Sequence, residues 1–133
     1  MGTYVLRAGF QEQYYIKAQK IRSALRRELD RLFSEVDLLM LPTFPSQAFL
    51  HGQEELDGFQ QKIADRFTVP ANLAGIPALS FPVDRIGGLP VGLQFLAPMF
   101  GEGRLFAAAK EYRRVYRPER PDMSRRPAEG AVL

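Results

Sequence analysis

The sequence predicts an α/β fold in which helices cover a parallel or mixed sheet. Two segments repeat apolar residues at steps of three and four, a spacing that is typical of helices with one buried face. Three short apolar runs, each bounded by proline, are typical of strands. The expected order is helix, strand, helix, strand, strand, helix. Three strands make only a thin sheet. We therefore expect this chain to hold one end of a larger sheet, so that the sheet within this chain is incomplete.

The first expected helix covers residues 10–34. Its apolar stripe consists of Phe10, Tyr14, Ala18, Ile21, Leu25, Leu29, Leu32 and Val36. The basic residues between them are interpreted as a face in contact with water. The run at residues 38–41 is apolar at every position, as in a strand that is buried on both faces. Pro42 ends this strand, and we expect residues 42–58 to be a loop.

The later elements are expected at residues 59–67 (helix), 71–73 (a short helical stretch), 78–81 (strand), 91–96 (strand) and 102–116 (helix). Pro70 limits the second helix, because proline disfavours a helical residue before it, and Gly75 ends the short stretch. Pro82 is expected at the end of a strand, since proline cannot donate to a strand ladder. Gly87 and Gly88 mark a turn between the last two strands.

The composition limits what the chain can do by itself. It has 133 residues, enough for one domain, and a net charge of +3. Cysteine is absent and His51 is the only histidine, which excludes disulfides, thiolate zinc sites and sites with several histidines. No apolar run is long enough to span a membrane, and the N-terminus lacks the pattern of a signal peptide. We therefore expect a cytoplasmic chain that binds neither membranes nor DNA directly.

Few residues are candidates for chemistry. A Ser-His-acid triad would need His51, and no serine lies in a G-x-S-x-G nucleophile elbow. The carboxylates at positions 54, 55 and 57 cluster in a polar loop, where solvation is the ordinary state. We therefore expect no catalytic or metal-binding residues in this chain. Asp65 differs, because it is expected on an otherwise apolar helix, at its end before the break at Pro70: its carboxylate either binds an ammonium group or pairs with Arg66 or a neighbouring lysine.

Four segments read together resemble a known family. They are YYIKAQKIR, VDLLMLPTFP, FTVPANLAGIPALSFPV and GLPVGLQFLAP, in this order along the chain. They resemble the C-terminal part of amidase-signature enzymes, and most closely the A subunits of the glutamyl-tRNA(Gln)/aspartyl-tRNA(Asn) amidotransferases. The resemblance implies that residues 1–116 are the C-terminal segment of an amidase domain, with part of the family's large mixed sheet between helix layers. Residues 117–133, with three prolines and mixed charge, are expected to be a disordered tail.

The resemblance implies a function for the complete protein. In this family a serine, activated by a second serine and a lysine, hydrolyses an amide. The A subunit releases ammonia from glutamine, the B subunit uses ATP and Mg²⁺ to activate glutamate on mischarged tRNA, and the C subunit steadies the pair. The Ser-Ser-Lys set lies in the family's N-terminal part, and the arginine that holds the glutamine carboxylate would precede Gly2. We therefore expect this chain alone to be inactive, to use no cofactor and to reach tRNA only through the B subunit.

One substrate-binding residue follows from the resemblance. Asp65, five residues before Pro70, matches the acid that binds the α-amino group of glutamine. Residues 56–61 depart from the family's pattern, because Leu-Asp-Gly-Phe-Gln-Gln stands where an Asp-Pro-Leu stretch leads to Met-Tyr. This departure leaves open a segment of another amidase, acting on small amides. A third interpretation is a stand-alone interaction module without catalysis.

Overall fold

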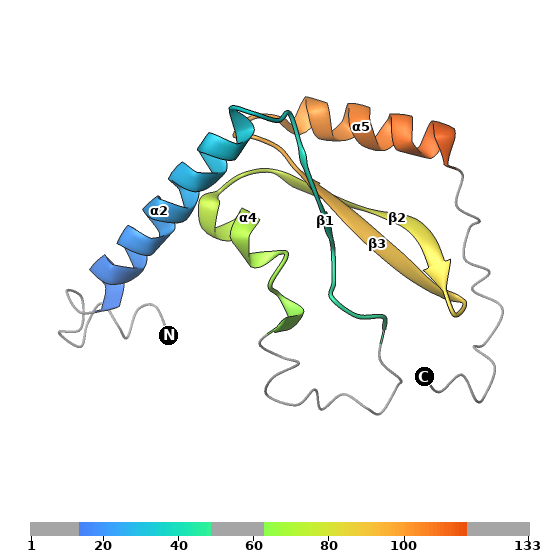
Figure 1. Cartoon of the computed structure of the whole chain (residues 1–133), viewed down its shortest axis with the longest axis horizontal. Helices are drawn as coiled ribbons and strands as arrows, with labels where there is room; N and C mark the ends of the chain where they lie inside the picture. The colour runs from blue at the N-terminus through green and yellow to red at the C-terminus, as the bar shows by residue number, and fades with distance from the viewer. Residues whose placement is uncertain (1–13, 49–62, 117–133) are drawn as a thin grey trace.

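The computed structural model describes residues 14–48 and 63–116. Its elements are α2 (Ile16–Phe33), β1 (Leu39–Pro42), α4 (Val69–Ala74), β2 (Ala78–Ile86), β3 (Leu89–Leu96) and α5 (Glu102–Val115) (Figure 1). The predicted order of helices and strands is confirmed. The start of the first helix, residues 49–62 and the tail predicted at 117–133 lie outside the described residues. Within the described part of the chain, no helix is long and apolar enough to cross a membrane.

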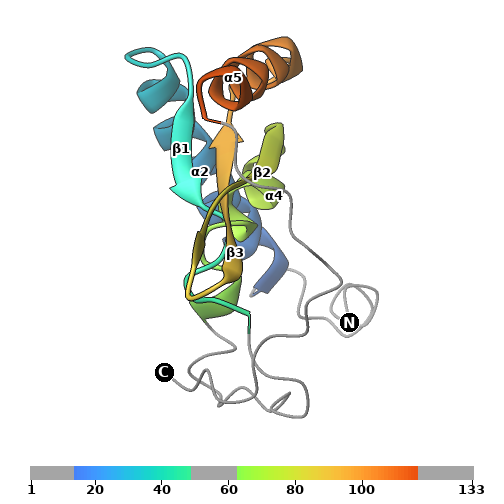
Figure 2. The same ribbon diagram turned by 90° about the vertical axis from the view of Figure 1, so that its right-hand side faces the viewer.

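The three strands form one sheet in the order β1-β3-β2, and both pairs are antiparallel (Figures 1 and 2). Leu96 of β3 is the shared partner of Leu39 on β1 and Ala78 on β2. The predicted turn between β2 and β3 is confirmed, since Gly87 and Gly88 take φ angles of +59° and +82°. Residues with a side chain rarely adopt these angles, so the two glycines allow a tight hairpin.

Pro82 does not end the second strand, as the sequence predicted. It lies inside β2, which continues to Ile86. The pairing with β3 is irregular at this point, because Pro82 faces Gly92 whereas Asp84 faces Val91. An edge strand with a bulge tolerates proline, since the missing N–H group is not needed for the ladder there.

Helices pack on both faces of the sheet. On one face, β3 contributes Leu96 to a core with residues from α2, α4 and the segment after α4, namely Leu29, Ala71, Ala74 and Ile76. On the other face Phe81, Phe95 and Tyr112 form an aromatic cluster, in which the Phe81 ring centroid lies 4.7 Å from that of Phe95 and 5.1 Å from that of Tyr112. Tyr112 belongs to α5, so this cluster attaches the last helix to the sheet.

α4 begins earlier than expected. The sequence placed a helical stretch at residues 71–73 after a break at Pro70, but Pro70 lies in the first turn of α4. The first backbone N–H groups of a helix have no partner within it, so proline costs little at this position. Gly75 ends the helix as predicted, with a left-handed φ of +71°.

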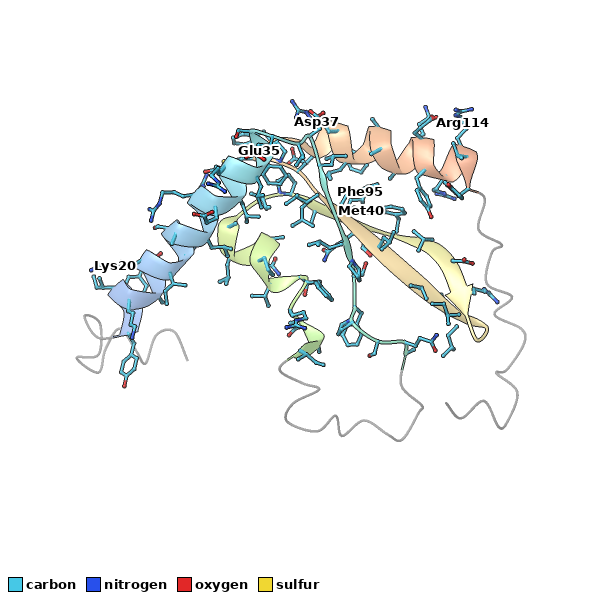
Figure 3. All side chains as sticks on the ribbon, in the orientation of Figure 1. Lys20, Glu35, Asp37, Met40, Phe95 and Arg114 are labelled. Carbon is cyan, nitrogen blue, oxygen red and sulfur yellow. The ribbon has the colours of Figure 1, made fainter. Side chains whose placement is uncertain are left out.

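Part of the apolar surface predicted to be buried is exposed. Leu29 is buried and Leu25 partly buried, but Ile21 of the same stripe is 62% exposed. Met40 on β1 is 59% exposed, so this strand is not buried on both faces within the described residues. Figure 3 labels Met40 beside Phe95, its partner across the β1–β3 pair. The apolar surface at Ile21 and Met40 is therefore in contact with solvent.

Candidate functional site

The candidate site centres on Asp65, in the turn that leads into α4. The Asp65 carbonyl oxygen accepts hydrogen bonds from the backbone N–H groups of Thr68 (3.1 Å) and Val69 (2.9 Å). The Thr68 hydroxyl donates to the same oxygen at 3.3 Å. These bonds close the turn and hold the Asp65 backbone at the start of the helix. Helical structure before this turn is described only from Ile63, since residues 59–62 lie outside the described part.

The Asp65 side chain is exposed to solvent. Within residues 14–48 and 63–116, its carboxylate has no hydrogen bond or ion pair. Its neighbour Arg66 instead places its guanidinium over the Phe67 ring, 5.9 Å from the ring centroid. Pairing of Asp65 with Arg66 is therefore not observed, and the neighbouring lysine, at position 62, lies outside the described residues. An exposed carboxylate without a local partner can accept charge-assisted hydrogen bonds from an ammonium group.

A buried glutamine connects this turn to the sheet. Gln94 on β3 is 3% exposed, and it is the only buried polar side chain among the described residues. Its side-chain nitrogen donates to the carbonyl oxygens of Phe67 (2.7 Å) and Pro42 (3.1 Å). Both amide hydrogens of Gln94 therefore have acceptors. Sequence reasoning missed this residue, although a single polar residue in the apolar run at 91–96 was a usable signal.

The other end of α4 is attached to α2. The Arg22 Nε group donates to the Leu73 carbonyl oxygen at 2.6 Å. Within α4, the Asn72 side-chain amide donates to the Thr68 carbonyl oxygen at 3.3 Å. Gly75 completes this end with its left-handed conformation. α4 is therefore held at both ends, and the turn that contains Asp65 has little freedom to move away from the sheet.

Two hydroxyl groups lie beside Gln94. Thr43 and Ser80 are hydrogen-bonded, with 2.8 Å between their hydroxyl oxygens, and Ser80 faces Gln94 across β2 and β3. The Thr43 N–H group donates to the Gly92 carbonyl oxygen at 3.1 Å. A Cβ atom at Gly92 would lie 3.2 Å from the Thr43 hydroxyl oxygen, closer than usual. Glycine at position 92 therefore permits this close approach.

The described residues offer no nucleophile with a base. Ser34 donates to the Arg31 carbonyl oxygen at 2.7 Å, and Ser80 pairs with Thr43. No serine in residues 14–48 or 63–116 is hydrogen-bonded to a lysine or histidine. The same residues contain no group of three or more metal-ligating side chains. The triad candidate His51 and the carboxylates at 54, 55 and 57 lie outside the described part of the chain.

Comparison with known sequences gives one consistent result. The amidase family model matches residues 1–106. The A subunit of glutamyl-tRNA(Gln) amidotransferase from Synechococcus sp. (strain RCC307) is 46% identical over 127 residues, covering 91% of this chain and 26% of that protein. The protein of the same name from Pseudomonas aeruginosa (strain LESB58) is 45% identical over 115 residues, covering 86% and 24%. The chain thus spans about a quarter of the length of these relatives.

Comparison with solved structures agrees. The crystal structure of the glutamyl-tRNA(Gln) amidotransferase A subunit from Thermotoga maritima matches with a TM-score of 0.68 and 41% identity, over 79% of this chain and 23% of that one. A second crystal structure, of an amidase, matches with a TM-score of 0.70 and 32% identity, over 79% and 25%. The incomplete sheet thus matches part of a larger fold, as the sequence predicted. The chain belongs to the amidase family, and it corresponds to a C-terminal portion of that family's enzymes.

Proposed function

We propose that this chain is the C-terminal segment of the A subunit of a glutamine-dependent amidotransferase, and that Asp65 binds the α-ammonium group of glutamine. The complete protein would hydrolyse glutamine to glutamate and ammonia, and the ammonia would convert glutamate on mischarged tRNA(Gln) into glutamine. The names of the relatives support this reaction class. The role of Asp65 rests on one observation, an exposed carboxylate that has no partner within residues 14–48 and 63–116, on a backbone that is held in place.

The segment would contribute substrate binding and no bond-breaking group. An ammonium group contacts a carboxylate through short, charge-assisted hydrogen bonds, which fix the position of the rest of the substrate. The nucleophile and its base would come from the remaining three quarters of the enzyme. The B subunit would use ATP and Mg²⁺ and would contact tRNA, and the C subunit would stabilise the complex. The complex would act in the cytoplasm.

Exposed apolar residues support the need for the rest of the enzyme. Met40 and Ile21 are more than half exposed, although both belong to patterns typical of buried positions. A covering protein layer would remove them from water. We therefore expect the purified 133-residue chain to release no ammonia from glutamine. Hydrolysis by the pure chain above the rate of a mock preparation would refute this part of the proposal.

The role of Asp65 can be tested in a complete enzyme. The matching quarter of the A subunit from Pseudomonas aeruginosa is replaced by this sequence, and two amides are compared. Glutamine has the α-ammonium group, whereas glutaramate has the same length and terminal amide but lacks it. We expect Asp65→Asn to lower kcat/KM for glutamine by at least about tenfold, because a charge-assisted contact is lost. The value for glutaramate should stay unchanged.

A matched control uses another exposed carboxylate, since Asp84→Asn removes a charge on β2 away from the turn. This variant should behave like the parent with both amides. The proposal fails if Asp65→Asn leaves the ratio of the two kcat/KM values at its parental level. That result would favour another amidase acting on small amides, the alternative that the departure at residues 56–61 leaves open.

The remaining alternative, a stand-alone interaction module, makes a different prediction. Such a module must fold without the rest of the enzyme, despite its unpaired strand edges. A monomeric 133-residue chain with a cooperative melting transition would favour this alternative. An aggregated or non-cooperative chain would count against it.

A further inference from the structure

We propose that Gln94 is a positioning residue for glutamine binding, because it holds the turn that contains Asp65 at a fixed place over the sheet. This inference rests on the proposed role of Asp65. Gln94 would not touch the substrate. It would act through the backbone, since Phe67, whose carbonyl oxygen accepts the 2.7 Å hydrogen bond from Gln94, is two residues from Asp65.

The sequence context makes an amide at this position unusual. β3 is otherwise lined by apolar side chains near its end, including the flanking Leu93 and Phe95. Burying an amide costs free energy unless its polar atoms find partners, whereas leucine or methionine would add apolar contacts. The Gln94 nitrogen does find two partners, and they belong to two different segments, the end of β1 and the turn before α4. A purely apolar core would need no such residue.

Gln94 is also the turn's only hydrogen-bonded link to the sheet among the described residues. The bonds that Asp65 and Thr68 make stay within the turn and the first residues of α4. The bond from Arg22 attaches the far end of α4, and it leads to α2 and not to the sheet. Removal of the Gln94 donor would therefore leave the turn closed but without a hydrogen bond to β3, held to the sheet only through the packing of α4 near Leu96.

A shift of the turn relative to β3 would affect one part of the substrate. A carboxylate–ammonium contact depends on both distance and direction, so displacement of Asp65 weakens binding of the α-ammonium group. We expect a change in KM for glutamine with little change in kcat. An amide without the α-amino group has no contact to lose. A general loss of folding would instead reduce the activity toward both amides together.

The test uses the same complete enzyme, in which this sequence replaces the matching quarter, with glutamine and glutaramate as substrates. Gln94→Met keeps the length of the side chain and removes both donors. We expect KM for glutamine to rise about tenfold, because the contact between the displaced Asp65 carboxylate and the α-ammonium group is weakened, with kcat/KM for glutaramate unchanged. Gln47→Met is the matched control, because it removes a glutamine side-chain hydrogen bond, to the Ile86 carbonyl oxygen, that does not reach the turn. It should leave the glutamine-to-glutaramate ratio at the parental value.

A double variant separates this inference from the proposal on Asp65. If Gln94 acts through Asp65, Gln94→Met added to Asp65→Asn should change the ratio no further. If Asp65→Asn lowers the ratio but Gln94→Met does not, the inference on Gln94 is overturned while the role of Asp65 stands. If Asp65→Asn itself has no effect on the ratio, the proposed role of Asp65 fails, and the inference on Gln94, which rests on that role, fails with it.

A second variant covers the case in which Gln94→Met does not fold. Gln94→Asn keeps a buried amide but is one methylene shorter, so it cannot reach both carbonyl oxygens. It should also raise KM for glutamine selectively, while kcat/KM for glutaramate shows that the enzyme remains folded. A folded Gln94→Asn enzyme with parental KM values for both amides would overturn the positioning role.

Discussion

Arg22 and Leu73 are joined by a 2.6 Å hydrogen bond from the guanidinium Nε to the carbonyl oxygen, across 51 positions of the sequence. The carbonyl belongs to the last turn of α4, where backbone oxygens have no partner within the helix. The positive charge of the guanidinium also interacts favourably with the negative end of the helix dipole. One side chain on α2 thus stabilises a helix of only six residues.

Replacement of Arg22 should destabilise the chain. We expect Arg22→Met to lower the free energy of unfolding by up to about 1 kcal/mol, because a hydrogen bond from a charged donor is lost at an exposed site. Arg27→Met is the control, since Arg27 is an exposed residue of the same helix. Both variants are made in the complete enzyme in which this sequence replaces the matching quarter, and urea unfolding followed by circular dichroism measures their stability. Equal stability of the two variants would contradict the role given to Arg22.

Gly75 should not tolerate a side chain. Its φ of +71° is unfavourable for alanine, so Gly75→Ala should cost about 1 to 2 kcal/mol of folding free energy. Gly103 lies in the first turn of α5, and nothing lies within 4 Å of the place where its Cβ would be. Gly103→Ala should therefore stabilise the chain by up to about 1 kcal/mol. Opposite shifts of the two melting temperatures are expected, and shifts of the same sign would show that backbone conformation does not decide these two positions.

The exposed face of β1 should matter for assembly. When this chain and the remaining part of an amidotransferase A subunit are produced as two separate chains, Met40→Lys should weaken their association about tenfold or more, because a charge would enter an apolar contact. Ile86→Lys is the control, since Ile86 is 56% exposed at the tip of the β2–β3 hairpin. Titration by light scattering measures the dissociation constants. Equal weakening by both variants would mean that β1 has no special part in the contact.

The last helix has one pH-dependent pair. The Arg114 guanidinium donates hydrogen bonds to both oxygens of Glu111 and lowers the pKa of that carboxyl below its ordinary value of 4.5. The pair therefore stabilises the folded state above pH 4.5, and this contribution is lost as pH falls through the lowered pKa. Both side chains are exposed, so the effect is small. The melting temperature of Glu111→Gln should lie slightly below the parental value at pH 7 and meet it in acid; a constant difference across pH would contradict this assignment.

Local patterns predicted the elements better than their ends. The steps of three and four in α2 and α5 and the glycine pair in the hairpin depend on nearby residues, and all three were predicted correctly. Pro70 and Pro82 were both interpreted as boundaries, and both lie inside elements. Proline is tolerated at both places because of its position: Pro70 lies in a first helical turn, and Pro82 lies beside a bulge of an edge strand. Those positions follow from tertiary structure, which local patterns do not contain.

The candidate site was predicted in part. Asp65 was identified from its resemblance to a family position. The sequence could not show that Asp65 forms no ion pair with Arg66, because Arg66 instead lies over the Phe67 ring, and this contact has no sequence signature. Gln94 was missed because its importance comes from two carbonyl oxygens, on Pro42 and Phe67, that only the folded chain brings near. Contacts between distant segments decide both cases.

The strand order β1-β3-β2 also has a consequence for synthesis. β1 leaves the ribosome first, yet its only described hydrogen-bonding partner is β3, the last strand to be made. The β2–β3 hairpin can form from contacts close in sequence, whereas β1 must wait and then add to the open side of β3. Pairing of β1 with β3 is therefore a late step in the formation of this part of the sheet.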